Sequence, residues 1–122
     1  MSEVLKMKNY DNFILPAGDL EKGKDFYQGI LGMPVKFEFP EIGMVAFKVG
    51  EEEPAIILSN RPDTQPTIWF EVKDVKTAFR ELTEKGIRFI SEPFQIKTGL
   101  AVEFFDPFGN KLGMTDYTAL MK

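Results

Sequence analysis

The chain has 122 residues, of which 43% are apolar and 28% charged, and it contains neither histidine nor cysteine. The missing cysteine excludes a disulfide framework, a thiolate nucleophile and a zinc–thiolate cluster. The missing histidine excludes the commonest metal ligand and the Ser-His and Cys-His nucleophile pairs. Fifteen basic and nineteen acidic residues give a net charge of −4, which repels phosphate backbones, so nucleic acid is not expected as a partner.

The distribution of apolar residues gives no sign of a membrane segment. No run of eighteen consecutive apolar residues occurs, so a membrane-spanning helix is not expected. The N-terminal residues have no apolar segment behind their charges, so we expect no signal peptide and a cytoplasmic protein. A chain of this length buries about two-thirds of the surface that its unfolded form exposes. Residues 1–122 are therefore expected to fold as a single domain.

Two octapeptides that end at Asp19 and Asp74 mark an internal repeat. In each, alternate residues are apolar, as in a strand that packs one face against a helix. Apolar residues at helical spacing follow each aspartate, and the carboxylate is predicted to cap that helix. Gly32 and Gly86 are predicted to end the helices in the left-handed conformation. The apolar stripe of the first helix comprises Leu20, Phe26, Tyr27, Ile30 and Leu31, and that of the second Val75, Ala78, Phe79 and Leu82.

Three short strands are predicted after each helix, so each half reads as β-α-β-β-β and the fold class is α+β. The turn at residues 106–110 separates the last two, with Gly109 supplying a positive φ. The proline-containing segment 60–66 links the halves into modules at about residues 1–60 and 66–122. The consecutive carboxylates Glu51–Glu53 are predicted to form a solvated loop. The six strands are Val35–Pro40, Met44–Val49, Ala55–Ser59, Ile87–Ser91, Leu100–Phe105 and Lys111–Thr115.

Several motifs occur in a characteristic order along the chain. The first half contains Asp-Leu-Glu, Phe26-Tyr27 and Ile30-Leu31-Gly32, and the second Phe-Glu-Val-Lys-Asp-Val, Gly86 and Asp106-Pro-Phe-Gly-Asn110. Over about residues 6–117 this order resembles the vicinal oxygen chelate superfamily, which includes glyoxalases, bleomycin-resistance proteins and extradiol dioxygenases. The resemblance implies that two βαβββ modules form a pair of half-barrels with their helices outside. It also implies that the hollow between the sheets holds the ligand.

The resemblance further implies positions for metal ligands. Metal-dependent members place a ligand, commonly His, at the start of the first strand of each module, and a Glu just after the Asp-Pro-x-Gly-Asn turn. These positions fall on Asn12, Thr67 and Gly113, which lack the imidazole nitrogen and anionic oxygen that a catalytic divalent ion requires. The remaining ligand, when present, lies at about residues 55–59, which contain no His, Glu or Asp. We therefore expect no metal and no cofactor.

The resulting hypothesis is a metal-free protein of the glyoxalase and bleomycin-resistance type that binds a small molecule. The resemblance implies a homodimer with clefts built from both chains. Aromatic rings in the hollow would supply apolar contact area and polar side chains would orient the ligand. No catalytic residue is assigned. Strand alternation predicts that the ligand-binding residues are Asn12, Ile14, Thr67, Trp69, Glu103, Phe105 and Gly113, with Glu71, Lys111 and Thr115 beside them.

Competing interpretations exist for these residues and for the function. In the competing interpretations, Trp69 fills the core between the modules or a dimer seam instead of contacting a ligand. Asn12 then hydrogen-bonds a neighbouring strand end, and Glu103 lies in water. Gly113 either enlarges the pocket or marks a bulge or the close approach of another group. One alternative function is a metal-independent isomerase or lyase-like enzyme with Glu103 or Glu71 as general base. Another is a glyoxalase- or dioxygenase-type metal enzyme with displaced ligands.

Overall fold

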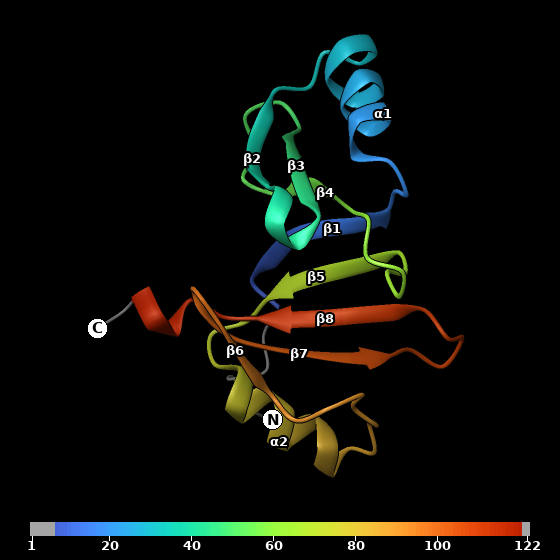
Figure 1. The fold of residues 1–122 in the computed structure, drawn as a ribbon. Helices are drawn as coiled ribbons and strands as arrows, with labels where there is room; N and C mark the ends of the chain where they lie inside the picture. The colour runs from blue at the N-terminus through green and yellow to red at the C-terminus, as the bar shows by residue number, and fades with distance from the viewer. Residues whose placement is uncertain (1–6, 121–122) are drawn as a thin grey trace. The chain divides into compact units, whose positions relative to one another are not determined.

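A computed structural model describes residues 7–120 of the chain. They form two compact units, which we call the N-terminal unit (residues 12–67) and the C-terminal unit (residues 7–11 and 68–120). Along the chain, strands and helices follow the order β-α-β-β-β twice (Figure 1). The predicted fold class, α+β with two βαβββ modules, is therefore confirmed.

The sheet of the N-terminal unit has the strand order β2-β3-β4-β1. β1 runs parallel to β4, with Phe13 opposite Ile56, and β3 lies antiparallel to both β2 and β4. Successive residues of a strand point to opposite faces, so Asn12 and Ile14 share one face while Phe13 and Leu15 share the other. The elements of this sheet are β1 (Asn9–Pro16), β2 (Val35–Phe39), the 3-10 turn η2 (Pro40–Ile42), β3 (Met44–Lys48) and β4 (Ala55–Ser59).

The helical segment of the N-terminal unit begins at the predicted cap. The Oδ1 atom of Asp19 accepts a hydrogen bond from the backbone N–H of Lys22 at 3.1 Å, and α1 (Leu20–Lys24) follows. The chain then winds as a π-helix, η1 (Asp25–Ile30). Gly32 ends the segment with a φ of +76°, as its predicted left-handed conformation requires.

The π-helical winding corrects the apolar stripe predicted for this helix. Leu20 and Tyr27 pack against the buried cluster of β3 and β4, but Phe26, Ile30 and Leu31 are 48%, 74% and 49% exposed. The backbone N–H of Leu31 donates to the carbonyl of Phe26 at 2.9 Å, the i to i+5 spacing of a π-helix. Each wider turn contains about one more residue than the 3.6-residue period assumed for the stripe. These side chains therefore leave the face on which Leu20 and Tyr27 lie.

The sheet of the C-terminal unit has the strand order β5-β8-β7-β6, and a helix packs on one of its faces (Figure 1). Val75 and Ala78 of that helix are buried in one apolar cluster with Val102 and Met114 of the sheet. Within residues 7–120, no helix has the length and apolar composition needed to span a membrane. The elements of this unit are β5 (Thr67–Glu71, of which Thr67 itself is the last residue of the N-terminal unit), α2 (Val75–Glu84), β6 (Phe94–Ile96), β7 (Gly99–Phe105), β8 (Lys111–Thr115) and the 3-10 turn η3 (Thr118–Leu120).

The predicted strand Ile87–Ser91 is wrong. Only Phe89 of this segment makes a β-bridge, to Phe104 of β7, and the strand that pairs with β7 is β6. The ring of Phe89 lies 4.7 Å from that of Phe79 and 5.3 Å from that of Phe104, measured between centroids. The aromatic packing holds this segment near β7 without a strand ladder, so apolar alternation alone gave the wrong strand.

Asp74 caps α2 as predicted, because its Oδ1 accepts a hydrogen bond from the backbone N–H of Thr77 at 3.2 Å. Replacing Asp74 by alanine is expected to lower the free energy of unfolding by about 1 kcal/mol. The matched variant Asp74→Ser keeps a capping oxygen and is expected to retain most of the stability. Urea denaturation followed by circular dichroism measures both, and an unchanged midpoint in Asp74→Ala would contradict the assigned role.

Candidate functional site

The two faces of the C-terminal sheet differ in character. One face carries Val102, Phe104 and Met114 and is covered by α2. On the other face, Glu103 of β7 lies opposite Gly113 of β8. Because alternate residues share a face, this second face carries four of the seven predicted binding residues: Trp69, Glu103, Phe105 and Gly113.

The indole of Trp69 lies directly on Gly113. A Cβ atom built on this glycine would lie 2.5–2.6 Å from the Cε3, Cδ2 and Cζ3 atoms of the ring, much closer than carbon atoms pack at van der Waals contact. Only glycine permits such an approach. The structure therefore favours the interpretation of close approach over the one in which Gly113 enlarges a pocket, since the ring fills that space.

An ion pair lies next to Gly113 on the same face of the sheet. The Nζ atom of Lys111 is 3.3 Å from Oε2 of Glu103, and the two side chains are only 17% and 24% exposed. They are diagonal neighbours on adjacent antiparallel strands, since Glu103 lies opposite Gly113 and Lys111 lies opposite Phe105. Glu103 is therefore a partly buried, paired carboxylate and does not project freely into water. Phe105, on the same strand, is partly exposed.

Trp69 also has a polar atom without a hydrogen bond. Its indole N–H is buried and has no acceptor within the described part of the chain. A buried donor without an acceptor costs about 1–3 kcal/mol.

Three predicted residues, Asn12, Ile14 and Thr67, belong to the N-terminal unit. The Oδ1 atom of Asn12 accepts a hydrogen bond from the backbone N–H of Ala55 at 3.1 Å, as the interpretation of a strand-end contact requires. Ile14 packs against the buried residues Ala46, Ala55 and Ile57, which lie on its own face of the sheet. The hydroxyl of Thr67 is buried and donates to the carbonyl of Gln65 at 2.8 Å. All three side chains are therefore engaged within their own unit.

The Asp-Pro-x-Gly-Asn motif of the resemblance forms the turn between β7 and β8. Oδ1 of Asp106 accepts hydrogen bonds from the backbone N–H groups of Phe108 and Asn110, at 2.8 and 2.9 Å, and Oδ2 accepts one from the Asn110 side chain at 2.8 Å. The Asn110 side chain, then its backbone N–H, contribute most to holding the pKa of Asp106 below 3.8. Gly109 has the predicted positive φ, +85°. The motif serves to place the start of β8.

The residues at the implied metal positions do not fit a divalent ion. Asn12 and Thr67 are neutral, and the indole covers Gly113. Glu103, which lies opposite Gly113, and Glu71, which lies on the same strand as Thr67, pair with Lys111 and Lys8, the latter at 3.4 Å. Within residues 7–120, no three Asp or Glu side chains are grouped as a metal site would require. The donor set that such an ion needs is thus not assembled from these side chains.

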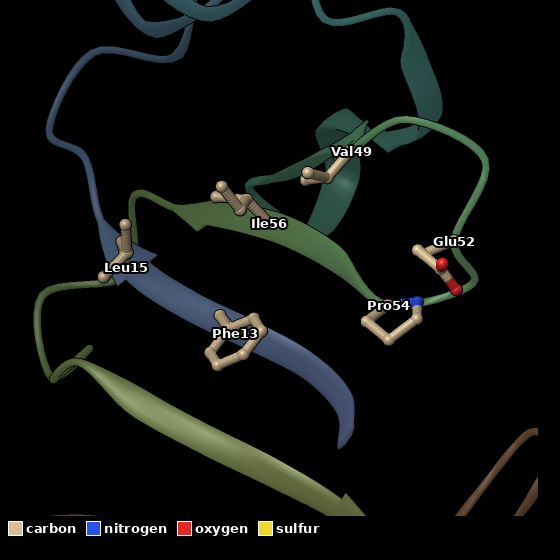
Figure 2. Close-up of a pocket in the computed structure, with 6 residues that line it drawn as sticks. All are labelled: Phe13, Leu15, Val49, Glu52, Pro54 and Ile56. Carbon is tan, nitrogen blue, oxygen red and sulfur yellow. The ribbon is translucent and has the colours of Figure 1, made fainter. Parts of the chain in front are cut away.

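A separate cavity of about 480 Å³ lies in the N-terminal unit (Figure 2). The sequence did not predict this cavity. Apolar residues on the helix-facing side of a strand are expected to fill the core, and the run Glu51–Glu53 is predicted to form a solvated loop. No sequence signal distinguishes a filled core from a cavity at such positions. The lining residues are Phe13, Leu15, Val49, Glu52, Pro54 and Ile56.

Comparisons with known proteins agree on one fold. A family model described as Glyoxalase/Bleomycin resistance protein/Dioxygenase superfamily matches residues 9–114. No curated protein matches the sequence.

Among solved structures, methylmalonyl-CoA epimerase from Mycobacterium tuberculosis has a TM-score of 0.74 at 16% identity, over 95% of this chain and 91% of that one. A variant of the Streptomyces coelicolor methylmalonyl-CoA epimerase with bound 2-nitronate-propionyl-CoA has a TM-score of 0.75 at 18% identity, over 93% of this chain and 97% of that one. A variant of homoprotocatechuate 2,3-dioxygenase from Brevibacterium fuscum has a TM-score of 0.74 at 23% identity, over 92% of this chain and 33% of that one. At these identities the likeness shows the fold alone.

Proposed function

Because the chain belongs to the glyoxalase/bleomycin resistance protein/dioxygenase superfamily, we propose that it binds a small molecule without a metal ion. The observation that carries the proposal is the indole of Trp69 on Gly113, the position to which the resemblance assigns a metal-binding carboxylate. The ring leaves no room for a carboxylate there. It offers instead a broad apolar surface that an aromatic or aliphatic ligand can contact.

The chemistry around the indole supports an amphipathic ligand. Phe105 adds partly exposed apolar surface on the same face, and the Glu103–Lys111 pair adds one acceptor and one donor. Partly buried charges interact more strongly with a polar group than charges in open water do. A ligand with an apolar body and one polar group matches this arrangement.

The metal-free proposal predicts binding that does not depend on divalent ions. Metal-depleted protein is titrated with methylmalonyl-CoA, homoprotocatechuate and bleomycin, chosen from the names of the relatives and the family, and then with a wider metabolite panel. Trp69 is the sole tryptophan, so its fluorescence reports binding near Gly113, and calorimetry gives the Kd. The same Kd is expected with chelator and with added Mg²⁺, Mn²⁺ or Zn²⁺. Binding that requires one of these ions would contradict the proposal.

Substitution of the ring distinguishes this face from the rest of the surface. Trp69→Leu removes the aromatic surface and is expected to weaken binding about tenfold, since aromatic contacts contribute about 0.5–1.5 kcal/mol beyond their buried area. The matched control is Phe108→Leu, because Phe108 is an exposed aromatic residue in the turn and not on the strand face. Equal losses in the two variants, measured by calorimetry, would argue against a site at Trp69.

A second proposal, a metal-independent isomerase or lyase-like enzyme, is favoured by the Glu103–Lys111 contact of 3.3 Å. A carboxylate next to an ammonium group supplies a general base and a cation that stabilises a developing oxyanion. The test is exchange of the C2 hydrogen of methylmalonyl-CoA in deuterium oxide, followed by mass spectrometry. Exchange above the uncatalysed rate that is lost in Glu103→Gln supports this proposal, and exchange that survives in this variant removes Glu103 from the mechanism.

We also propose that the chain acts as a homodimer. The resemblance implies such an assembly, and the exposed apolar side chains of Phe26, Ile30 and Leu31 are surface that a second copy could bury. Sedimentation velocity of the wild type and of Ile30→Ser measures the oligomeric state and whether this surface takes part in it.

A further inference from the structure

The strand register places the Glu103–Lys111 ion pair between two aromatic side chains of the C-terminal sheet. Glu103 lies opposite Gly113, and Lys111 lies opposite Phe105. The ion pair therefore occupies one diagonal of four facing residues. The other diagonal carries Gly113, on which the indole of Trp69 lies, and the partly exposed Phe105. A polar group placed at the ion pair would thus have apolar surface near it on two sides.

The ion pair leaves part of its hydrogen-bonding capacity unused. A carboxylate accepts hydrogen bonds at both oxygens, and an ammonium group donates three. The contact of 3.3 Å joins Nζ of Lys111 to Oε2 of Glu103. Among residues 7–120, neither side chain has another hydrogen-bond or ion-pair partner, and neither has a polar atom that is both buried and unpartnered. Glu103 can therefore accept a further hydrogen bond, and Lys111 can donate one.

The pair has no net charge, and this decides which polar group it favours. A ligand carboxylate that reaches the ammonium group of Lys111 also approaches the carboxylate of Glu103, which lies 3.3 Å from the same nitrogen. The repulsion then offsets much of the attraction. A ligand ammonium group at Glu103 is repelled by Lys111 in the same way. A neutral group that carries both a donor and an acceptor has neither disadvantage.

We propose that the polar group of the ligand bound on this face is a primary carboxamide or a lactam, whose N–H donates to Glu103 and whose C=O accepts from Lys111. The inference rests on the function proposed above and names the chemical class of its ligand. The N–H and the C=O of such a group point to the same side from one carbon atom, so they can bond both charges and leave the ion pair intact. Hydrogen bonds to charged groups are stronger than those between neutral groups.

Four probes with the same benzyl group test the proposal: phenylacetamide, N-methylphenylacetamide, phenylacetate and phenethylamine. In N-methylphenylacetamide the trans amide directs its N–H away from the C=O side, so it lacks the paired donor. Each probe is titrated into metal-depleted full-length protein, with Trp69 fluorescence and calorimetry as readouts. Phenylacetamide is expected to bind about tenfold more tightly than each of the others, the factor of one charge-assisted hydrogen bond.

Three outcomes of these titrations would overturn the proposal. The first is equal affinity for phenylacetamide and N-methylphenylacetamide, which would show that the paired donor is not used. The second is tighter binding of phenylacetate or phenethylamine, which would show that one charge of the pair dominates. The third is the absence of saturable binding of phenylacetamide up to its solubility limit.

Two variants of the ion pair are expected to shift the preference in opposite directions. Glu103→Gln leaves the ammonium group of Lys111 without its carboxylate and should favour phenylacetate. Lys111→Met leaves the Glu103 carboxylate unpaired and should favour phenethylamine. The matched control is Glu53→Gln, which removes one carboxylate from the Lys36–Glu53 pair, 3.6 Å apart in the N-terminal unit, and should keep the preference for phenylacetamide. Thermal melts identify folded variants, and the same order of affinities in Glu103→Gln, Lys111→Met and Glu53→Gln would overturn the assignment.

Substitution of the indole separates this inference from the function on which it rests. Trp69→Leu is expected to weaken all four probes by a similar factor and to keep their order of affinity, because it removes apolar surface and leaves the ion pair in place. If the wild type binds all four probes equally and Trp69→Leu weakens each of them, the ligand class is wrong and the metal-free binding function stands. If phenylacetamide binds only when Mg²⁺, Mn²⁺ or Zn²⁺ is added, the metal-free function fails, and the assignment fails with it.

Discussion

Replacing Asp116 by alanine is expected to lower the free energy of unfolding by about 3–5 kcal/mol. The side chain is fully buried. Its Oδ2 accepts a hydrogen bond from the backbone N–H of Val75 at 2.7 Å, and its Oδ1 accepts one from that of Leu100 at 2.9 Å. The backbone N–H and the hydroxyl of Thr118 donate to the same Oδ1 at 3.2 and 2.8 Å.

These four donors come from three different parts of the C-terminal unit. Val75 is the first residue of α2, Leu100 lies in β7 and Thr118 begins η3, so one carboxylate joins the start of the helix to the sheet and to the C-terminal turn. Alanine would leave all four donors without this acceptor. Asp116→Asn keeps one acceptor oxygen and is expected to lose less stability, while the exposed Asp63→Ala should change the free energy of unfolding by less than about 0.5 kcal/mol. Urea denaturation measures all three.

The contribution of Asp116 should disappear in acid. Burial by itself raises the pKa of this carboxyl, but the hydrogen bonds from Val75, Leu100 and Thr118 outweigh it and hold the pKa below the ordinary value of 3.8. A carboxyl with a lower pKa in the folded than in the unfolded state stabilises the fold above the unfolded pKa. That stability is lost as the pH falls through the folded pKa.

The difference in stability between the wild type and Asp116→Asn is therefore expected to be constant from neutral pH to about pH 5 and to shrink below about pH 4. Urea midpoints measured across this range give the difference. A gap between the two proteins that stays the same at every pH would contradict the assignment.

Replacing Gly113 by alanine is expected to lower the free energy of unfolding by about 1–3 kcal/mol, because the new Cβ overlaps the Trp69 ring and the packed strands cannot move apart freely. Gly18→Ala is the matched control, since a Cβ there meets no atom within 4 Å. In Trp69→Leu the smaller side chain makes room for the alanine. The double variant should therefore be more stable than the sum of the two single effects by about 1 kcal/mol.

The wild type, Gly113→Ala, Trp69→Leu and the double variant form a double-mutant cycle, which also bears on the proposed function. If the four proteins show additive losses in urea denaturation, the indole does not press on Gly113, and the observation that carries the metal-free proposal fails. If the two substitutions instead have non-additive effects on the free energy of unfolding, the indole fills the space at Gly113 and a carboxylate side chain at this position has no room. Binding by Gly113→Ala can then be compared with that of Trp69→Leu to show whether the ring contacts the ligand.

The sequence by itself determined the features that depend on neighbours a few residues away. An aspartate before an apolar helical pattern predicts a cap, and both Asp19 and Asp74 are caps. A glycine after such a pattern predicts a left-handed residue, and Gly32 and Gly86 have φ values of +76° and +96°. Strand alternation has a period of two residues, and it placed Glu103 correctly on the face opposite α2.

Only the tertiary structure decided the features that depend on residues far apart in the chain. The contact of Trp69 with Gly113 and the pairing of Glu103 with Lys111 depend on which strands are adjacent and in which register. The π-helical winding at residues 25–30 and the cavity beside Glu52 depend on how side chains fill space around them. Local pattern rules describe which face a residue is on, whereas packing between distant segments decides what it touches there.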